Sequence, residues 1–209
     1  MLEPIFTDRN EAARALIVPG DAESLARARD SALLQRATEL AIESAFMYGK
    51  DLPVGAVAAN SLWITGRYYA SDKRLNWPSV HAEVMALIDS EYNRDVSLGP
   101  DTLVVTVEPC NDCQDFIASQ DCGRITRIGF GLTRGEVAEK GLVKPHDESI
   151  FERVARLGYP YEVFKIEDEE LHKAGGIILD FVRRDTATGL TTIDTEGLTT
   201  ALSALNIAV

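Results

Sequence analysis

The sequence predicts an α/β fold, and three observations lead to this prediction. Apolar residues recur at three- and four-residue steps between Asp21 and Gly49, which indicates a long amphipathic helix. Short apolar runs on both sides of Asn60-Ser61 indicate an antiparallel hairpin. Residues 103–107 form an apolar run rich in β-branched residues, typical of a buried strand, and helical and strand patterns alternate after it.

The remaining elements follow from local signals. We expect hairpin strands at 53–58 and 62–64, a helix at 80–92, a helix opened by Cys110 and Cys113, a strand at 125–130, a helix near 150–157, a strand at 161–166 and a helix from Asp168 to Arg184. Proline is tolerated at a helix start, so Pro109 suits the beginning of the cysteine-bearing helix. A strand–helix–strand order favours parallel, right-handed connections. In the last helix, acidic residues after Asp168 and the closing Arg183-Arg184 complement the helix dipole.

Three segments describe the organisation of the chain. We expect an N-terminal extension at residues 1–24, a single domain at 25–185, and a C-terminal tail or short packing helix at 186–209. There is no apolar run of about 18 residues, so no membrane span is expected. The N-terminus also lacks the pattern of a secretory signal.

A metal site is indicated by one histidine and two cysteines. His81, Cys110 and Cys113 supply an imidazole and two thiolates, which are ligands for tetrahedral zinc. Their number favours a catalytic site, because structural zinc normally has four protein ligands. Glu83 is not needed as a ligand and is the candidate for moving protons. A structural zinc site and a redox pair of cysteines are the alternatives.

Composition limits the compartment and the partners. The third cysteine, Cys122, is expected to be a free thiol, and so few cysteines suit a reducing cytoplasm. The formal net charge of −12 opposes non-specific binding to nucleic acid, which depends on cationic contacts to phosphate. A local basic patch would have to come from the following residues: Lys73, Arg74, Arg124, Arg127, Arg183 and Arg184.

Three motifs together resemble the cytidine deaminase-like superfamily, and most closely its tRNA-adenosine deaminase and guanine deaminase branch. They are Leu52-Pro-Val-Gly-Ala-Val57, His81-Ala-Glu-Val-Met-Ala-Leu87, and Thr106-Val-Glu-Pro-Cys110 with Cys113. The resemblance covers roughly residues 25–185 and is specific for the superfamily. It departs at Ala70, where relatives usually carry an asparagine that contacts the substrate.

The resemblance implies a fold and a metal centre. The fold is a three-layer α/β/α arrangement with a five-stranded mixed sheet. Zinc is implied on His81, Cys110 and Cys113, with Glu83 moving protons during hydrolytic release of ammonia. Relatives are commonly dimers, so a homodimer is expected.

The resemblance also implies substrate contacts. These come from Val54, Gly55, Ala56 and Ala82, and Asp112 could also line the pocket. Tight packing of a strand is an equal alternative explanation for Gly55. A solvated surface carboxylate is an equal alternative for Asp112.

Three functions remain open from the sequence. The first is a zinc deaminase of a free nucleobase, nucleoside or related small amine, which the acidic charge and the departure at Ala70 favour. The second is deamination of adenosine 34 in tRNA, which needs a basic surface near the pocket. The third is a non-catalytic binding protein with a structural zinc, and Glu83 argues against it.

Overall fold

The computed structural model describes residues 22–48, 52–60, 64–68, 81–92, 101–119, 125–144, 148–185, 188 and 191–204. The expected N-terminal extension lies outside these residues except at its last three positions. The segment 69–80, which includes Ala70 and two cations of the expected basic patch, also lies outside them, as do Cys122 and Arg124.

A mixed five-stranded sheet forms the centre of the fold, as expected. Its strands lie in the order β2 (Ile64–Tyr68), β1 (Gly55–Ala59), β3 (Thr102–Val107), β4 (Arg127–Leu132) and β5 (Glu162–Lys165). β1 pairs antiparallel with both β2 and β3, whereas β3 with β4 and β4 with β5 are parallel.

Three strands begin two residues later than the sequence predicts, and the first of them is β1, which begins at Gly55 instead of residue 53. β2 begins at Ile64, where the expected second hairpin strand ends, and Leu62 and Trp63 lie outside the described residues. β4 runs from Arg127 to Leu132, and its last residue pairs with Val107 at the end of β3. Burial explains the error in β4, because Ile125 is buried ahead of the strand and looks like part of it in the sequence.

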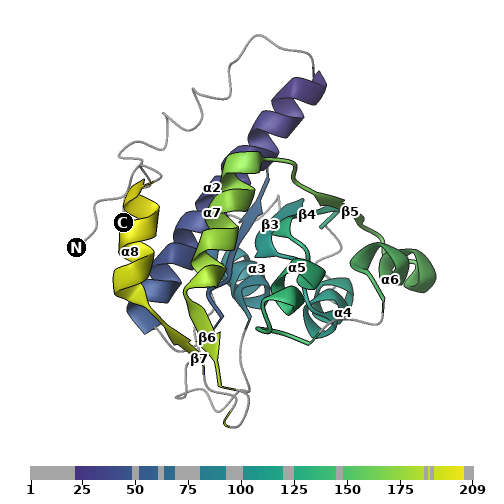
Figure 1. The fold of residues 1–209 in the computed structure, drawn as a ribbon. Helices are drawn as coiled ribbons and strands as arrows, with labels where there is room; N and C mark the ends of the chain where they lie inside the picture. The colour runs from purple at the N-terminus through teal and green to yellow at the C-terminus, as the bar shows by residue number, and fades with distance from the viewer. Residues whose placement is uncertain are drawn as a thin grey trace.

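Helices cover both faces of the sheet, which confirms the three-layer α/β/α architecture (Figure 1). On one face, α2 (Ala22–Tyr48) packs Leu33, Leu34 and Ala37 against β1 and β3, and α7 (Glu169–Asp180) lies beside α2. On the other face, α3 (Ala82–Tyr92) and α4 (Asn111–Ser119) bury apolar residues against the same strands. The two helices that carry the metal-site motif therefore share one face.

The connection after β4 contains two capped helices. α5 (Arg134–Glu139) is not expected from the sequence, although Thr133 and Glu136 form a complete capping box in front of it. α6 (Ile150–Leu157) confirms the expected helix; Ser149 and Glu152 form its capping box. Gly158 ends it at φ 66°, a left-handed conformation that favours glycine.

The C-terminal part of the chain differs from the prediction in one respect. α7 starts at its Asp168 cap as expected but ends at Asp180, and Arg183 and Arg184 belong to β6 (Val182–Arg184). β6 pairs with β7 (Thr191–Ile193), which leads into α8 (Thr195–Ala204). The helix ends early because the chain turns into this small sheet; Arg183 still donates to the carbonyl oxygen of Asp180.

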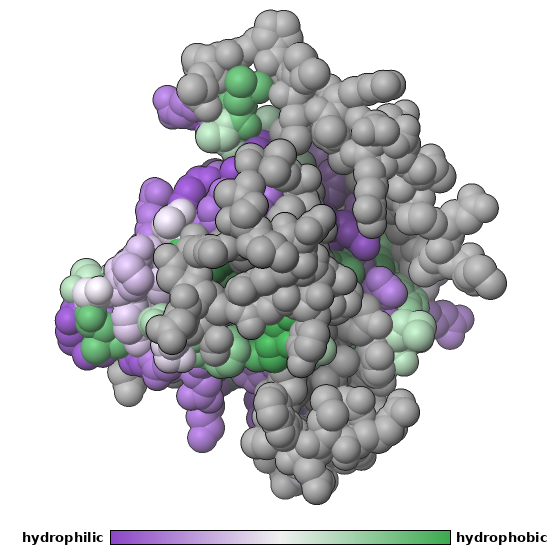
Figure 2. Space-filling view, turned by 180° about the vertical axis from the view of Figure 1, so that it is seen from behind, coloured by the Kyte–Doolittle hydropathy of each residue, from purple (hydrophilic) through white to green (hydrophobic). Residues whose placement is uncertain are grey.

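Both hydrophilic and apolar side chains reach the described surface (Figure 2). On the face shown in Figure 2, hydrophilic side chains form much of the margin of the described surface, and apolar ones appear as separate patches. The large apolar side chains that are exposed among the described residues are Met47, Phe151 and Leu157. None of the described helices is both long enough and apolar enough to cross a bilayer.

Candidate active site

The expected metal ligands come from the N-terminal ends of two neighbouring helices. The carbonyl oxygen of His81 accepts the first helical hydrogen bond of α3 from Met85, and that of Cys110 accepts the first bond of α4 from Gln114. Both ligands therefore stand directly before their helices, and Cys113 lies in the first turn of α4. Helix N-termini carry positive partial charge, which stabilises thiolates placed beside them.

The three ligand atoms converge on one point. His81 Nδ1 lies 3.1 Å from Cys113 Sγ and 3.3 Å from Cys110 Sγ, and all three ligand atoms lie within 4.8 Å of one another. For Zn–N bonds of about 2.0–2.1 Å and Zn–S bonds of about 2.3 Å, tetrahedral ligand atoms lie roughly 3.5 Å apart. The donor set and its spacing thus fit Zn²⁺. Within the described part of the chain, this is the group of side chains arranged to hold a metal.

Hydrogen bonds among the three ligand side chains shift their pKa values. A hydrogen bond from Cys113 lowers the pKa of Cys110 to about 3, and the same bond raises the pKa of Cys113. The hydrogen bond with Cys110 also raises the pKa of His81, although burial acts against it. Cys110 is therefore held as a thiolate, and a metal cation must displace the proton that remains on Cys113.

Glu83 lies beside the ligands in the first turn of α3. Its side chain is buried, with 4% of its surface exposed, and it shares a hydrogen bond with the thiol of Cys113. Burial raises its pKa, because the charged carboxylate loses hydration, and hydrogen bonds with its own backbone and Cys113 oppose the rise. A carboxyl group with a raised pKa next to a metal site is suited to accept and return protons near neutral pH.

The residues expected to contact the substrate differ in their exposure. Ala82 follows His81 directly; its side chain is buried, and its N–H belongs to the first turn of α3, where N–H groups have no partner within the helix. Val54 is half-buried directly before β1, and Asp112 is exposed between the two cysteines. Ala56 is fully buried in the core between the sheet and α3, so any contact from it would involve its backbone.

Gly55 has a structural explanation of its own. A β-carbon at this position would lie 1.9 Å from the carbonyl oxygen of Ala37 in α2. The close packing of β1 on α2 therefore requires glycine at this position. This agrees with the alternative explanation given for Gly55 from the sequence, which is tight packing of a strand. Its contact with a substrate remains a prediction.

Sequence reasoning missed two residues that hold the cysteine-bearing turn. Glu108 and Gln114 are both buried and polar, and their side chains form hydrogen bonds with backbone groups at or near this turn. A carboxylate between the apolar run of β3 and a proline was the available signal for Glu108, because a buried charge requires partners.

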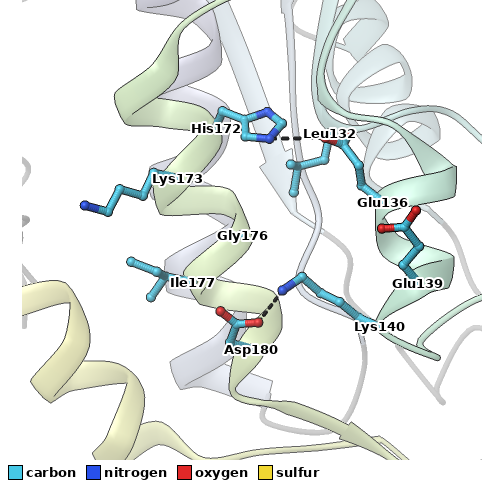
Figure 3. A pocket seen from close by; sticks show the side chains of 9 residues that line it. All are labelled: Leu132, Glu136, Glu139, Lys140, His172, Lys173, Gly176, Ile177 and Asp180. Atoms are coloured by element: carbon cyan, nitrogen blue, oxygen red, sulfur yellow. Dashed lines mark hydrogen bonds and ion pairs between the residues drawn. The ribbon is translucent and has the colours of Figure 1, made fainter.

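A separate hollow lies between α5 and α7 (Figure 3). It has a volume of about 410 Å³, and none of the expected site residues lines it. Four of its polar side chains pair across it: His172 Nε2 lies 3.1 Å from Glu136 Oε1, and Lys140 pairs with Asp180. The hollow therefore shares no lining residue with the metal site. Several of its charged side chains already form ion pairs with one another.

Comparison with known proteins identifies the region that carries the site. Residues 27–129 match the cytidine and deoxycytidylate deaminase zinc-binding region. The match spans just under half of the chain. The match includes all three metal ligands and Glu83, and it confirms the family resemblance drawn from the sequence motifs.

Several solved structures share the fold of this chain. A structure from a study of A-to-I editing by tRNA:A34 deaminases has a TM-score of 0.50 and 19% identity, and the match covers 69% of this chain and 99% of that chain. A guanine deaminase from Nitrosomonas europaea has a TM-score of 0.55 and 17% identity, over 71% of this chain and 81% of that chain. A crystal structure of NE0047 in complex with 2,6-diaminopurine has a TM-score of 0.53 and 16% identity, and the match covers 83% of this chain and 88% of that chain. No curated protein sequence matches the chain significantly.

Proposed function

We propose that the protein is a zinc-dependent hydrolytic deaminase of a nucleobase, nucleoside or related small amine. The observation that carries this proposal is the buried carboxyl group of Glu83 beside three convergent metal ligands. A site that served only to hold zinc would not need Glu83, because Glu83 is not one of the ligands.

The residues have separate roles in the proposed reaction. When bound, Zn²⁺ would make a water molecule a stronger acid and nucleophile at neutral pH. Glu83 accepts a proton from the attacking water and returns protons to the ring nitrogen and the departing amino group. One water is consumed, the ring carbon exchanges its C–N bond for a carbonyl, and ammonia leaves. His81, Cys110 and Cys113 would hold the cation throughout.

Val54, Gly55, Ala56, Ala82 and Asp112 are proposed to contact the base. The N–H of Ala82 suits a ring carbonyl or nitrogen acceptor, because it has no partner within α3. The similar structures include a guanine deaminase and a complex with 2,6-diaminopurine, which supports testing amino-purines first. The homodimer and the cytoplasmic location expected from the sequence belong to the same proposal.

Ammonia release from a panel of amino-purines, amino-pyrimidines and their nucleosides tests the proposal. Glu83→Gln should lower the rate by about 10²–10⁴-fold, the usual contribution of a general acid–base group, while zinc content stays unchanged. Glu162→Gln is the matched control, because this exposed glutamate lies on the edge strand β5. If the wild-type protein holds zinc but releases no ammonia from any member, the structural-zinc alternative is favoured instead.

Deamination of tRNA is the second candidate, supported by the similarity to a tRNA:A34 deaminase structure. One cation of the proposed basic patch is already engaged: Arg127 pairs with Asp30 at 2.8 Å and lies over the ring of Phe164. Gel shift of an anticodon stem-loop over a salt series tests this candidate. Binding that weakens steeply with salt would support it, and no binding even at low salt would count against it.

A further inference from the structure

Glu108 is buried at the turn that leads from β3 to the metal ligand Cys110. Only 7% of its surface is exposed. Its Oε2 accepts from the backbone N–H of Arg134 at 2.8 Å, and its Oε1 accepts from that of Ile150 at 3.0 Å. These two donors are the first residues of α5 and α6. One carboxylate therefore joins the positive ends of two helices to a single turn.

The two helices have capping residues of their own. α5 has the capping box of Thr133 with Glu136, and α6 has that of Ser149 with Glu152. Each box already satisfies N–H groups at its helix start. What Glu108 adds is the connection between those helices and the backbone next to Cys110.

The other side of the turn is held by α4. Gln114 is 1% exposed, and its Nε2 donates to the carbonyl oxygen of Pro109 at 2.8 Å, while its backbone N–H donates to that of Cys110 at 3.0 Å. Cys110 itself precedes α4, so the place of its thiolate depends on the turn. Cys113, by contrast, is fixed within the helix.

We propose that Glu108 is a positioning residue for the metal ligand Cys110. By accepting from two helix N-termini at once, it fixes the 108–110 backbone and so the direction of the Cys110 thiolate. An amide cannot replace it, because a glutamine offers one acceptor oxygen and would place an NH₂ group against the second N–H donor. The proposal depends on the metal site alone and not on the deaminase reaction.

Metal binding by folded variants tests the proposal. We expect Glu108→Gln to weaken Zn²⁺ and Co²⁺ binding by about 10–100-fold, as is typical for residues that orient metal ligands. The thiolate-to-cobalt charge-transfer band of the Co²⁺ protein should also change in position or intensity. Glu152→Gln is the control, because it makes the same substitution at another carboxylate that accepts a backbone N–H at the start of α6, without touching the turn. It should leave both measurements as in the wild type.

A second pair of variants isolates one hydrogen bond without changing the carboxylate. Arg134→Pro removes the N–H that donates to Glu108, and proline is tolerated at this first helical position. Arg134→Ala keeps that N–H and is the matched control. We expect the proline variant to bind Co²⁺ roughly threefold to tenfold more weakly than the alanine variant, as one lost hydrogen bond would predict.

The proposal is overturned if Glu108→Gln folds and binds metal with wild-type affinity and an unchanged cobalt spectrum. It is also overturned if Glu152→Gln loses as much affinity as Glu108→Gln. Should Glu108→Gln fail to fold, the Arg134 pair decides alone, and equal affinities in that pair would refute the proposal. An absence of deaminase activity in the wild type would affect only the proposed function.

Discussion

The carbonyl oxygen of Ala37 leaves no room for a side chain at Gly55. A β-carbon there would lie 1.9 Å from that oxygen and 2.9 Å from the N atom of Ala41, both backbone atoms of α2. Gly55→Ala should therefore push β1 away from α2 and destabilise the protein by about 1–3 kcal/mol, the usual cost of overpacking. Urea denaturation measures the change. Gly135→Ala is the control, because the nearest atom to its β-carbon, Thr133 Oγ1, is 3.7 Å away.

Glu136 should make stability depend on pH. Burial raises its pKa, but hydrogen bonds from Thr133 and the nearby Lys165 outweigh burial and hold the pKa below its ordinary value of 4.5. A carboxyl group with a lowered folded-state pKa stabilises the protein above its unfolded pKa, and this contribution is lost as pH falls through the folded value.

Glu136→Gln should accordingly cost about 1 kcal/mol at pH 7, the scale of a lost helix cap, and progressively less below pH 4.5. Urea unfolding at pH 7 and at pH 4 measures both values. Glu139→Gln on the same helix is the control, since this glutamate is exposed. An equal cost at both pH values would contradict the assignment.

Gly176 weakens α7 without a packing reason. A β-carbon at Gly176 has no atom within 4 Å, whereas one at Gly175 lies 3.1 Å from Leu132 Cδ1. Gly176→Ala should therefore stabilise the protein by up to about 1 kcal/mol, the helix-propensity difference. Thermal unfolding should show a rise of about 2–4 °C per kcal/mol. Gly175→Ala should gain less because Leu132 must move, and an equal gain at both positions would contradict this explanation.

The C-terminal helix α8 belongs to the packed core. Leu198 and Leu202 are fully buried in one apolar cluster with residues of α2 and α7. Leu198→Ala should destabilise the protein by about 2–5 kcal/mol, the range for a buried leucine. Ser203→Ala on the exposed side of the same helix should change stability little. A small effect of Leu198→Ala, measured by denaturation, would mean that α8 is a dispensable tail.

Local signals explain which elements could be predicted. The apolar period of α2 and the β-branched residues of β3 reflect burial against neighbouring layers, so their positions followed from the sequence. The sequence left α8 open as a tail or a short packing helix, because its docking beside α7 depends on the pairing of β6 with β7 at the end of α7. The Thr133–Glu136 box did carry a signal for α5, but a six-residue helix has too short a pattern to support it.

The same distinction applies to the site. His81, Cys110 and Cys113 were predictable because metal ligands follow a fixed chemistry and spacing. Glu108 was not, because its role depends on α5 and α6 arriving at one carboxylate from 26 and 42 residues away. Contacts of that kind exist only in the folded molecule.

Metal binding should stabilise the whole molecule. The ligands join the N-terminal ends of α3 and α4, which the unfolded chain does not hold together. A ligand that binds only the folded state adds about 2.7 kcal/mol at 100 times its dissociation constant. Zinc should therefore raise the midpoint of urea unfolding, and a chelator should reverse the effect.

The variant Cys113→Ser tests whether zinc stabilises the protein through the three-ligand site and not through non-specific binding. Loss of one thiolate should abolish most of the zinc-dependent stabilisation, because the remaining His81 and Cys110 leave the cation with two protein ligands. Ser119→Ala, at the exposed end of the same helix α4, should respond to zinc as the wild type does. If zinc stabilised Cys113→Ser as strongly as the wild type, the cation would be binding elsewhere, and the three-ligand site would lose its support.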